Sequence, residues 1–380
     1  MKKLKIALVH DYLQEFGGAE RVVLALHQAF PEAPLYVGFY DPEGLGSHIS
    51  HFNDIKILST FLGKIPFHQQ LRSPLRLLAP WAFASLDLRA FDVVIASTNA
   101  YHAKAVRVHE DAALLIYTHT PARSLYGYDT RSNWKKNRYT TFFGEIINHF
   151  LRLQDYEDVR RADQIIVNSR TVAKRVQKYW RQPSTVVYPP VNFIDAADKK
   201  SKLTPIDGRD YYLFVNRLNF AKHPELAVQA AIDLDLPLKI VGEGPLTPSL
   251  AEMILDADAS DRIFLLGSVP DNRLRTLYAG AKALLYPVVD EDFGIVPVEA
   301  MAYGTPVIAH RSGGPQETII DGRTGVFFDK LHLKNFSATI QQSQKIDFDP
   351  DYIRAHASQF SQEQFIKKMR KIVDQYAKNS

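Results

Sequence analysis

Residues 291–307 read EDFGIVPVEAMAYGTPV, and this stretch decides the fold of the C-terminal half of the chain. One apolar run, 283–287, precedes it, and a second, 306–309, overlaps its end. Proline is tolerated in the first turn of a helix, so Pro297 fits a helix that begins at about Ile295. Gly294 permits a close backbone approach just before that helix. The stretch therefore predicts a strand–helix–strand unit whose helix begins with free N–H groups after a strand.

The same alternation of strand and helix extends outward in both directions. Short continuous apolar runs are typical of parallel strands that are covered on both faces, and the segments between them have helical periodicity. Such runs lie at 4–9, 91–96, 114–117, 165–167, 185–188, 211–216, 238–241 and 263–266. We therefore predict an α/β fold with doubly wound parallel sheets.

The length and one polar segment predict the domain organisation. A chain of 380 residues is long enough for two domains, each with its own core. Residues 192–210 are polar, charged and contain Pro and Gly, which is typical of a linker. We predict one domain over 1–195, a second over 205–360, and a separate last helix within 361–380.

The composition excludes several classes of protein. There is no cysteine, and hence no disulfide, thiolate metal site or cysteine nucleophile. The net charge of +4 is too small to indicate a nucleic-acid partner. No apolar run approaches the roughly 18–20 residues that span a bilayer, and the run after Met1 stops at Val9, too early for a secretory signal. We expect a cytoplasmic protein, with peripheral attachment to the inner face of the membrane as a further hypothesis.

Two glutamates flank the start of the predicted helix at 295. Glu291 and Glu299 are eight residues apart. The free N–H groups at a helix start bind phosphate, aided by the helix dipole. Glu299, one turn into the helix, can accept hydrogen bonds from a ribose diol, and Glu291 lies where a donor sugar hydroxyl would be. The alternative is a pair of solvated acids on the helix surface.

This segment resembles the E-x7-E signature of the GT-B fold retaining glycosyltransferases, sequence family four (glycosyl transferases group 1). The resemblance extends over nearly the whole chain. It implies two Rossmann-like domains that face each other across a cleft, with the acceptor on the N-terminal domain and the sugar nucleotide on the C-terminal one. It also implies that the last helix packs back on the N-terminal domain, and that the chain is a metal-independent retaining hexosyltransferase.

Arg217 and Lys222 follow the first strand of the second domain, and they match the cations of the family. A departing nucleoside diphosphate gains charge on its β-phosphate, and two cations can stabilise it in place of a metal ion. The family usually has Gly before this Arg and Gly or Asn after this Lys, whereas Asn216 and His223 stand here. We expect no metal and no cofactor beside the nucleotide-sugar donor.

Further donor-binding positions follow from the resemblance. The glycine loop at Gly17 and Gly18 would offer backbone N–H groups to the diphosphate. Asp271 would accept from a guanine base, which favours GDP, although Asp at this position also suits a helix N-cap. The remaining predicted donor contacts are Gly242 in a G-x-G-P turn, Val269, Phe293, Gly294, Ile295 and Val296.

The N-terminal half supplies the acceptor-side candidates. His119 ends a predicted strand in the segment YTHTP, and His102 lies in the preceding loop. Ser97 stands where many family members have a His. With Arg123 and Tyr126, the HTP segment resembles a mannosyltransferase-like branch that acts on lipid-linked oligosaccharides, which favours mannose as the sugar. A structural role for either His is the alternative.

Two basic clusters indicate a membrane surface or a polyprenyl-diphosphate acceptor. Residues 61–86 contain three basic and no acidic residues, interleaved with Phe, Leu and Trp, and 134–138 read WKKNR. Basic residues beside aromatic ones suit an anionic bilayer. The alternative is a core helix with solvated charges.

Two other functions compete with sugar transfer. An NAD-dependent oxidoreductase requires G-x-G-x-x-G after a strand, but Gly242 and Gly244 are followed by Thr247. A non-catalytic sugar-nucleotide-binding protein of the same fold would lack one of Arg217, Lys222, Glu291 or Glu299, and all four are present. The resemblance implies a glycan or a lipid-linked saccharide as the acceptor, and a polyprenyl-diphosphate carrier would explain the two basic clusters.

Overall fold

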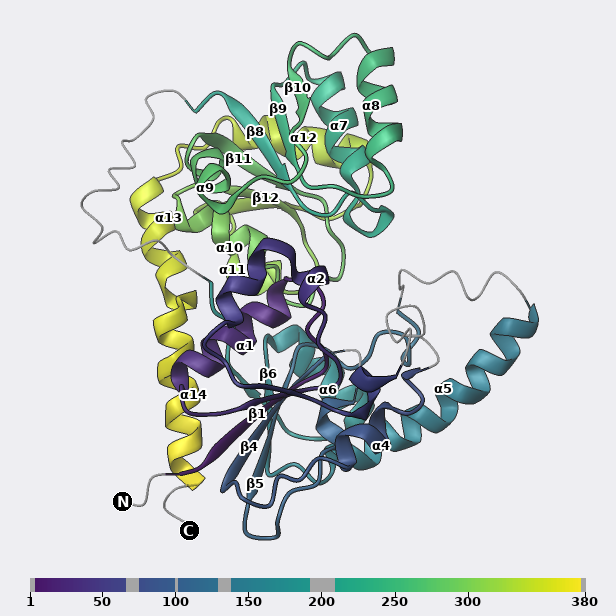
Figure 1. Cartoon of the computed structure of the whole chain (residues 1–380). Helices are drawn as coiled ribbons and strands as arrows, with labels where there is room; N and C mark the ends of the chain where they lie inside the picture. The colour runs from purple at the N-terminus through teal and green to yellow at the C-terminus, as the bar shows by residue number, and fades with distance from the viewer. Residues whose placement is uncertain (1–3, 66–74, 100–101, 129–137, 192–208, 377–380) are drawn as a thin grey trace. The chain divides into compact units, whose positions relative to one another are not determined.

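The chain divides into two compact units in the computed structural model (Figure 1), which describes residues 4–65, 75–99, 102–128, 138–191 and 209–376. Unit 1 comprises Met1–Pro190 and Gln362–Ser380, and unit 2 comprises Val191–Ser361. Most of the predicted linker, 192–208, lies outside the described residues.

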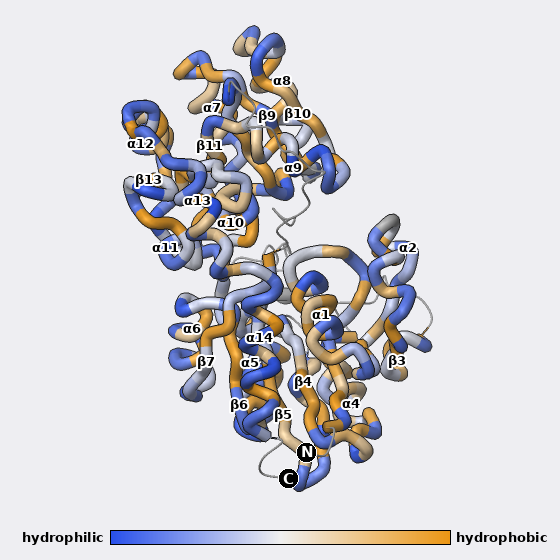
Figure 2. Tube along the Cα trace, turned by 90° about the vertical axis from the view of Figure 1, so that its left-hand side faces the viewer, coloured by the Kyte–Doolittle hydropathy of each residue, from blue (hydrophilic) through white to orange (hydrophobic). Residues whose placement is uncertain are grey.

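Unit 1 contains a seven-stranded sheet in the order β3-β2-β1-β4-β5-β6-β7. Every neighbouring pair in it is parallel. The central strands are buried apolar runs, which are orange in Figure 2. The strands are β1 Ile6–His10, β2 Leu35–Val37, β3 Ile57–Ser59, β4 Val93–Thr98, β5 Ala113–Thr118, β6 Gln164–Val167 and β7 Thr185–Val186.

The last helix of the chain packs on unit 1, as the family resemblance implied. Phe365 and Met369 of this helix are buried in the core that also holds Val22 and Leu26. Arg370 Nε donates to the carbonyl oxygen of Ala29 at 3.1 Å. The helices and 3-10 helices of unit 1 are α1 Gly18–Ala29, α2 Pro42–Leu45, α4 Ala79–Ala84, α5 Arg138–Val159, α6 Arg170–Trp180, α14 Gln362–Tyr376, η1 Gly46–Phe52, η2 Phe61–Lys64 and η3 Ala103–Ala105.

Unit 2 contains a six-stranded parallel sheet in the order β10-β9-β8-β11-β12-β13. Its strands are β8 Tyr211–Val215, β9 Leu238–Val241, β10 Ile263–Leu265, β11 Ala281–Tyr286, β12 Val307–His310 and β13 Gly325–Phe328. Its helices and 3-10 helices are α7 Pro224–Asp233, α8 Thr247–Asp256, α9 Asp271–Ala279, α10 Ile295–Ala302, α11 Pro315–Thr318, α12 Leu333–Ser343, α13 Pro350–Ala357, η5 Phe220–Lys222 and η6 Ser358–Phe360.

Both sheets are doubly wound, which confirms the predicted fold class. The strand order reverses between β1 and β4 in unit 1 and between β8 and β11 in unit 2. In open parallel sheets, ligands bind outside the carboxyl ends of the strands at this switch point. The residues that end or follow these four strands are therefore the candidates for ligand contacts.

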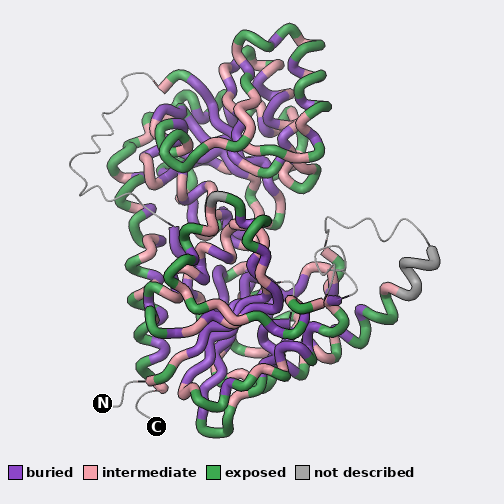
Figure 3. Tube along the Cα trace, viewed as in Figure 1, coloured by how far each residue is buried: buried purple, intermediate pink, exposed green. Residues whose placement is uncertain are grey.

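Helix α5 buries one face, which includes Leu151 and Val159, and exposes the other (Figure 3), but large apolar side chains also lie on its exposed face. Its exposed residues include Ile146, Phe150 and Leu153, at helical spacing. Phe150 is 65% exposed and Leu153 is 53% exposed. Among the described residues, no helix combines the length and the apolar character that crossing a bilayer requires.

Candidate functional site

Lys222 and Glu291 meet at the switch point of unit 2. Lys222 ends η5, just after β8, and Glu291 follows β11. The Lys222 Nζ forms an ion pair with Glu291 Oε2. Both side chains are more than three-quarters buried, so their charges are partly removed from water. The attraction between the two charges is therefore stronger than it would be at an exposed surface. Lys222, which we predicted to contact the diphosphate, and Glu291, which we predicted to contact a sugar hydroxyl, thus lie together.

A third residue, Tyr286, supports this pair. It is the last residue of β11, and its hydroxyl donates to Glu291 Oε2 at 3.3 Å. Burial, and then the negative charge of Glu291, raise the pKa of Tyr286 well above its ordinary value. The phenol therefore stays protonated and acts as a donor. Tyr286 was not among the predicted site residues, because only its place at the end of the strand before Glu291 could have pointed to it.

Two glycines after β12 allow the backbone around Glu291 to adopt its position. A Cβ on Gly313 would lie 2.3 Å from the Glu291 carbonyl oxygen, and one on Gly314 would lie 2.3 Å from Phe293 Cα. Gly314 N–H donates to that Glu291 oxygen at 2.8 Å. Any side chain here would displace the loop that carries Glu291. Sequence analysis also missed these glycines, although two adjacent glycines after a strand are a signal of close packing.

Helix α10 begins between the two glutamates, as predicted. Gly294 caps it with φ of 83°, a left-handed conformation that favours glycine, and Ile295 and Val296 form its first turn. Phe293 is buried against Phe360, with ring centroids 5.8 Å apart. Pro297 lacks an N–H, so the donors at this helix start come from the residues before it.

Glu299 is oriented by a tyrosine. Tyr278, in α9, donates its hydroxyl to Glu299 Oε2 at 3.0 Å. The ring of Tyr278 stacks on Tyr303, with 5.8 Å between centroids and an interplanar angle of 7°. The stacked pair fixes the carboxylate one turn into α10. Tyr278 was not among the predicted site residues, because no local pattern marks it.

Arg217 lies in a turn that packs against the G-x-G-P turn. A Cβ on Gly242, whose φ is 123°, would lie 1.9 Å from the Asn216 carbonyl oxygen, and one on Gly244 would lie 2.3 Å from that of Leu218. Leu218 N–H also donates to the Glu243 oxygen at 3.0 Å. The absence of a side chain at these two glycines thus allows the G-x-G-P turn to pack against the loop that carries Arg217.

Val269 and Asp271 follow β10 at the start of α9. Helix α9 begins at Asp271 itself, and Pro270 occupies the N-cap position. The alternative that Asp271 caps this helix is therefore wrong by one residue, because the helical turn already includes it. Asp271 is exposed and Val269 is partly buried.

In unit 1, His10, Ser97 and His119 lie together at the switch point between β1 and β4. His10 ends β1, Ser97 lies in β4, and His119 follows β5. Ser97 Oγ is 3.1 Å from His10 Nδ1 and 2.9 Å from His119 Nε2. The strand prediction ended before Ser97, but β4 extends one residue beyond it, so the side chain is buried within the sheet.

The glycine loop joins this cluster through Glu20. Glu20 Oε1 lies 3.7 Å from His10 Nε2, and Glu20 Oε2 accepts from Gly17 N–H at 2.9 Å. Gly17 is the N-cap of α1, and Gly18 is its first residue. The Gly17 N–H, which we predicted to face the diphosphate, is used here by the protein itself.

Burial keeps His119 neutral. Loss of water, and then the nearby His10, lower the pKa of His119 to about 3. The side chain of Asn168 donates to the His119 carbonyl oxygen at 2.9 Å, which fixes the backbone of this residue. His119 therefore presents a neutral, oriented ring near neutral pH.

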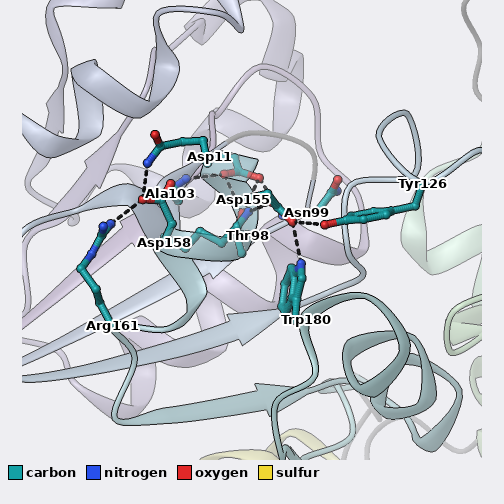
Figure 4. A network of polar contacts seen from close by, with 11 residues as sticks. Asp11, Thr98, Asn99, Ala103, Tyr126, Asp155, Asp158, Arg161 and Trp180 are labelled. Carbon is teal, nitrogen blue, oxygen red and sulfur yellow. Dashed lines mark hydrogen bonds and ion pairs between the residues drawn. The ribbon is translucent and has the colours of Figure 1, made fainter. Parts of the chain in front are cut away.

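Asp11, which sequence analysis missed, fastens the loop after β4 to β1 (Figure 4). Its carboxylate accepts from Thr98 Oγ1 at 3.0 Å, from Asn99 N–H at 2.6 Å and from Ala103 N–H at 3.0 Å. Burial would raise the pKa of Asp11, but His10, the N–H of Asn99 and Lys104 together hold it below its ordinary value. The buried charge thus fixes the loop that holds His102.

His102 lies just before η3 and is almost fully buried. Burial, and then the charge of Lys104, lower the pKa of His102 to about 3. Lys104 Nζ forms a buried ion pair with Asp155 Oδ1 at 2.7 Å. Asp155 Oδ2 accepts from Tyr126 at 2.7 Å and from Trp180 at 2.5 Å, as Figure 4 shows.

The predicted acceptor-side residues Arg123 and Tyr126 belong to this second network. Tyr126 stacks on Tyr179 with 4.2 Å between ring centroids, and its hydroxyl is used by Asp155. The guanidinium of Arg123 lies 5.9 Å from the centre of the Tyr128 ring. The predicted residues thus gather around His119 and around Asp155 in unit 1, and around Glu291 in unit 2.

Comparison with known proteins agrees with this arrangement. Residues 16–193 match the family described as Glycosyltransferase Family 4, and residues 195–375 match Glycosyl transferases group 1. The chain is 28% identical over 382 residues to the alpha-1,3/1,6-mannosyltransferase ALG2 of Candida glabrata, covering 84% of this chain and 78% of that protein.

Two further proteins resemble the chain, one over only part of its length and the other at lower sequence identity. The chain is 34% identical over 139 residues to the D-inositol 3-phosphate glycosyltransferase of Pseudarthrobacter chlorophenolicus, which is 34% of this chain and a third (33%) of that protein's length. Anabaena HepE, solved in complex with UDP, has a TM-score of 0.68 at 17% identity and covers 98% of this chain and 100% of its own. At that identity, the likeness shows the fold alone.

The two family matches adjoin at 193 and 195 and together span nearly all of the described chain. Each falls on a doubly wound sheet of the GT-B type. The chain belongs to the GT-B fold glycosyltransferases, group 1, and to their mannosyltransferase-like branch.

Proposed function

We propose that this glycosyltransferase transfers a hexose, with mannose favoured, from a nucleoside-diphosphate sugar to a glycan or a polyprenyl-diphosphate-linked saccharide, with retention of anomeric configuration. The observation that carries the proposal is the Lys222–Glu291 pair at the switch point of unit 2. It brings a cation for the diphosphate and an acceptor for sugar hydroxyls to the one edge of the sheet where ligands bind.

In the proposed reaction, the bond between the anomeric carbon and the β-phosphate oxygen breaks, and the acceptor oxygen bonds that carbon from the same face. The departing phosphate takes the acceptor proton. Lys222, Arg217 and the N–H groups that begin α10 stabilise the charge gained by the phosphate. Glu299, oriented by Tyr278, accepts from the ribose hydroxyls.

This arrangement requires no metal ion, because the cations and the helix start supply positive charge at the leaving group. We therefore propose that transfer proceeds in the presence of EDTA. Strict dependence on Mg²⁺ or Mn²⁺ would contradict the proposal.

The nucleobase is proposed to be guanine for two reasons. ALG2 of Candida glabrata is by name a mannosyltransferase, which favours GDP-mannose as the donor, and Asp271 is an exposed acceptor at the start of α9. HepE, which shares the fold, was solved with UDP, so uridine is the competing base. Thermal denaturation with GDP, UDP and ADP separates them. A ligand at 100 times its Kd stabilises by about 2.7 kcal/mol, and the largest shift is expected with GDP.

The sugar and the stereochemistry are tested in the same preparation. Incubation with GDP-mannose and a mannosylated polyprenyl-diphosphate analogue is expected to give an α-linked product, as read by the anomeric coupling in NMR spectra. A β-linked product would contradict retention. Transfer only from a UDP-sugar would leave the enzyme class intact and would replace mannose and GDP.

An anionic bilayer is the proposed partner of the apolar face of unit 1. Ile146, Phe150 and Leu153 form a stripe along α5, and Trp81 of α4 is 67% exposed. Arg76, just before α4, donates to Asn148 of α5 at 3.0 Å, so the two elements adjoin. Exposed apolar side chains beside a segment with basic and no acidic residues, 61–86, match a surface with apolar and anionic layers. Within α4, Ala79, Pro80, Ala82 and Phe83 are buried, which agrees with the alternative of a core helix, and Trp81 is the exposed residue that supports the bilayer proposal.

Flotation with vesicles tests this surface. We expect the protein to float with phosphatidylglycerol-containing vesicles and not with phosphatidylcholine alone, and binding to fall at least several-fold in Phe150→Ser/Leu153→Ser. Leu255→Ser in α8 of unit 2 is the matched control, since Leu255 is 71% exposed. Equal binding by all variants would contradict the role of α5. The residues Trp134–Asn137 of the second basic cluster lie outside the described residues.

A further inference from the structure

The cluster around Ser97 contains enough contacts to determine where the protons lie. His10 Nδ1 is 3.1 Å from the backbone carbonyl oxygen of Ser97 and 3.1 Å from its Oγ. A carbonyl oxygen only accepts, so His10 Nδ1 must carry a proton. This holds whether His10 is neutral or charged, because Nδ1–H is present in both forms.

The proton on His10 decides the direction of the next hydrogen bond. Ser97 Oγ accepts from His10 and has one proton of its own to donate. The other polar atom within reach of Oγ, in the part of the chain that the structure describes, is His119 Nε2 at 2.9 Å. Ser97 is 1% exposed, so solvent does not compete for that proton. The hydroxyl therefore donates to Nε2.

A neutral imidazole that accepts at Nε2 carries its proton at Nδ1. We infer that His10 and Ser97 are positioning residues that fix His119 in the Nδ1–H tautomer, so that its ring offers a hydrogen-bond donor and not a base. Nδ1 of His119 has no hydrogen-bond partner among the described residues. The ligand group that meets this nitrogen must then be an acceptor, such as a sugar hydroxyl oxygen or a phosphate oxygen.

The opposite tautomer is excluded by the balance of donors. If His119 Nε2–H donated to Ser97 Oγ, the oxygen would receive two protons from the histidines and its own proton would be buried without an acceptor. Leaving a buried donor unsatisfied costs about 1–3 kcal/mol. The low pKa of His119 agrees with the neutral ring that this tautomer requires.

The tautomer is measured directly on the full chain labelled with ¹⁵N-histidine. Long-range ¹H–¹⁵N correlation spectra distinguish the two tautomers by the shifts of the ring nitrogens, and His119→Gln identifies the signals of this residue. We expect the Nδ1–H pattern in the wild-type protein. An Nε2–H pattern for wild-type His119 overturns the inference without any variant being required.

Three variants test the role of Ser97. Ser97→Ala removes the donor to Nε2 and is expected to give a mixture of tautomers, whereas Ser97→Thr keeps the hydroxyl and the Nδ1–H form. Thr118→Val is the matched control, because it deletes a buried hydroxyl that is next to His119 but has no hydrogen-bond partner in the described chain. An unchanged pattern of His119 ring-nitrogen shifts in Ser97→Ala would contradict the role of the Ser97 hydroxyl in fixing the tautomer.

The activity arm of this test rests on the proposed function. There, Ser97→Ala is expected to lower kcat/KM about fivefold to tenfold, as for loss of one hydrogen bond, and Ser97→Thr to restore it. If Ser97→Ala changes the tautomer of His119 but not kcat/KM, the role of Ser97 in fixing the tautomer is confirmed and His119 does not contact the substrate. The two failures are therefore distinguishable.

Discussion

Lys222 and Glu291, 69 residues apart in the sequence, form an ion pair across the two central strands of unit 2. One follows β8 and the other follows β11, which are neighbours in the sheet. The cation assigned to the diphosphate and the acid assigned to the sugar thus neutralise each other before a donor is bound. Under the proposed function, donor binding exchanges this contact for contacts to phosphate and sugar hydroxyls.

Glu291→Ala is expected to abolish transfer while leaving nucleoside-diphosphate binding mostly intact. The carboxylate is lost, but Lys222 becomes available to the phosphate. Transfer is measured by the amount of product formed, and GDP binding is measured by calorimetry. Glu252→Ala, an exposed glutamate of α8, is the control and should retain full turnover. Unchanged turnover in Glu291→Ala would contradict the site.

Lys222→Ala is expected to reduce turnover by at least ~10²-fold, the usual effect of removing a preorganised charge stabiliser. Lys330→Ala provides the control, because Lys330 is exposed after β13. Single-turnover kinetics with saturating donor measure the effect on the chemical step. A loss confined to donor KM would assign Lys222 to binding alone.

Tyr278→Phe tests the orientation of Glu299. Loss of the 3.0 Å hydrogen bond should raise the KM for the donor severalfold, with kcat little changed, because one such hydrogen bond contributes about 1 kcal/mol. Tyr303→Phe keeps the stacked ring and serves as the control. Identical KM values for the two variants would remove Tyr278 from the donor site.

Gly242→Ala is expected to destabilise unit 2 far more than Gly322→Ala does. Both glycines have positive φ, 123° and 74°, but an added Cβ meets the Asn216 oxygen at 1.9 Å only in the first case and open space in the second. The control should lose about 1 kcal/mol from backbone strain alone. Urea unfolding measures both. Equal losses would show that the turn beside Arg217 relaxes freely.

Stability should fall as the pH drops below 6.5. The folded-state pKa values of His102 and His119 are about 3, whereas the ordinary value is 6.5. Between these limits the unfolded chain binds protons that the folded chain does not. The unfolding free energy of unit 1 should then decrease by up to about 1.4 kcal/mol per pH unit for each histidine.

Denaturant unfolding at pH 7 and at pH 5.5 measures this slope, and His119→Gln should reduce it. Asp11, whose pKa is lowered, adds to the loss only at pH values below its ordinary 3.8. A flat profile between pH 7 and 5.5 would show that both histidines are accessible to protons in the folded chain.

The sequence was sufficient for the fold and for the residues that lie close together along the chain. The apolar runs predicted the parallel strands, and the 291–307 stretch predicted the helix at Ile295 with its glycine cap. These features depend on local patterns, such as continuous burial and a proline in a first turn. At Ser97 the prediction differed from the structure, because strand β4 continues past its apolar residues to Thr98.

The supporting residues could not be predicted, because they act across the sheet. Asp11 and Asn99 are 88 residues apart, and only the strand order, with β1 beside β4, brings them together. Tyr278 likewise reaches Glu299 from another helix. Such contacts depend on topology, and the amino-acid pattern around each residue contains no mark of its partner.

The most direct measurement is a crystal structure of the chain with GDP bound in the presence of EDTA. We expect the β-phosphate to contact Lys222, Arg217 and the N–H groups that begin α10, and the ribose hydroxyls to contact Glu299. A nucleotide bound away from these groups, or one that binds only when a divalent cation bridges its phosphates, would contradict this expectation.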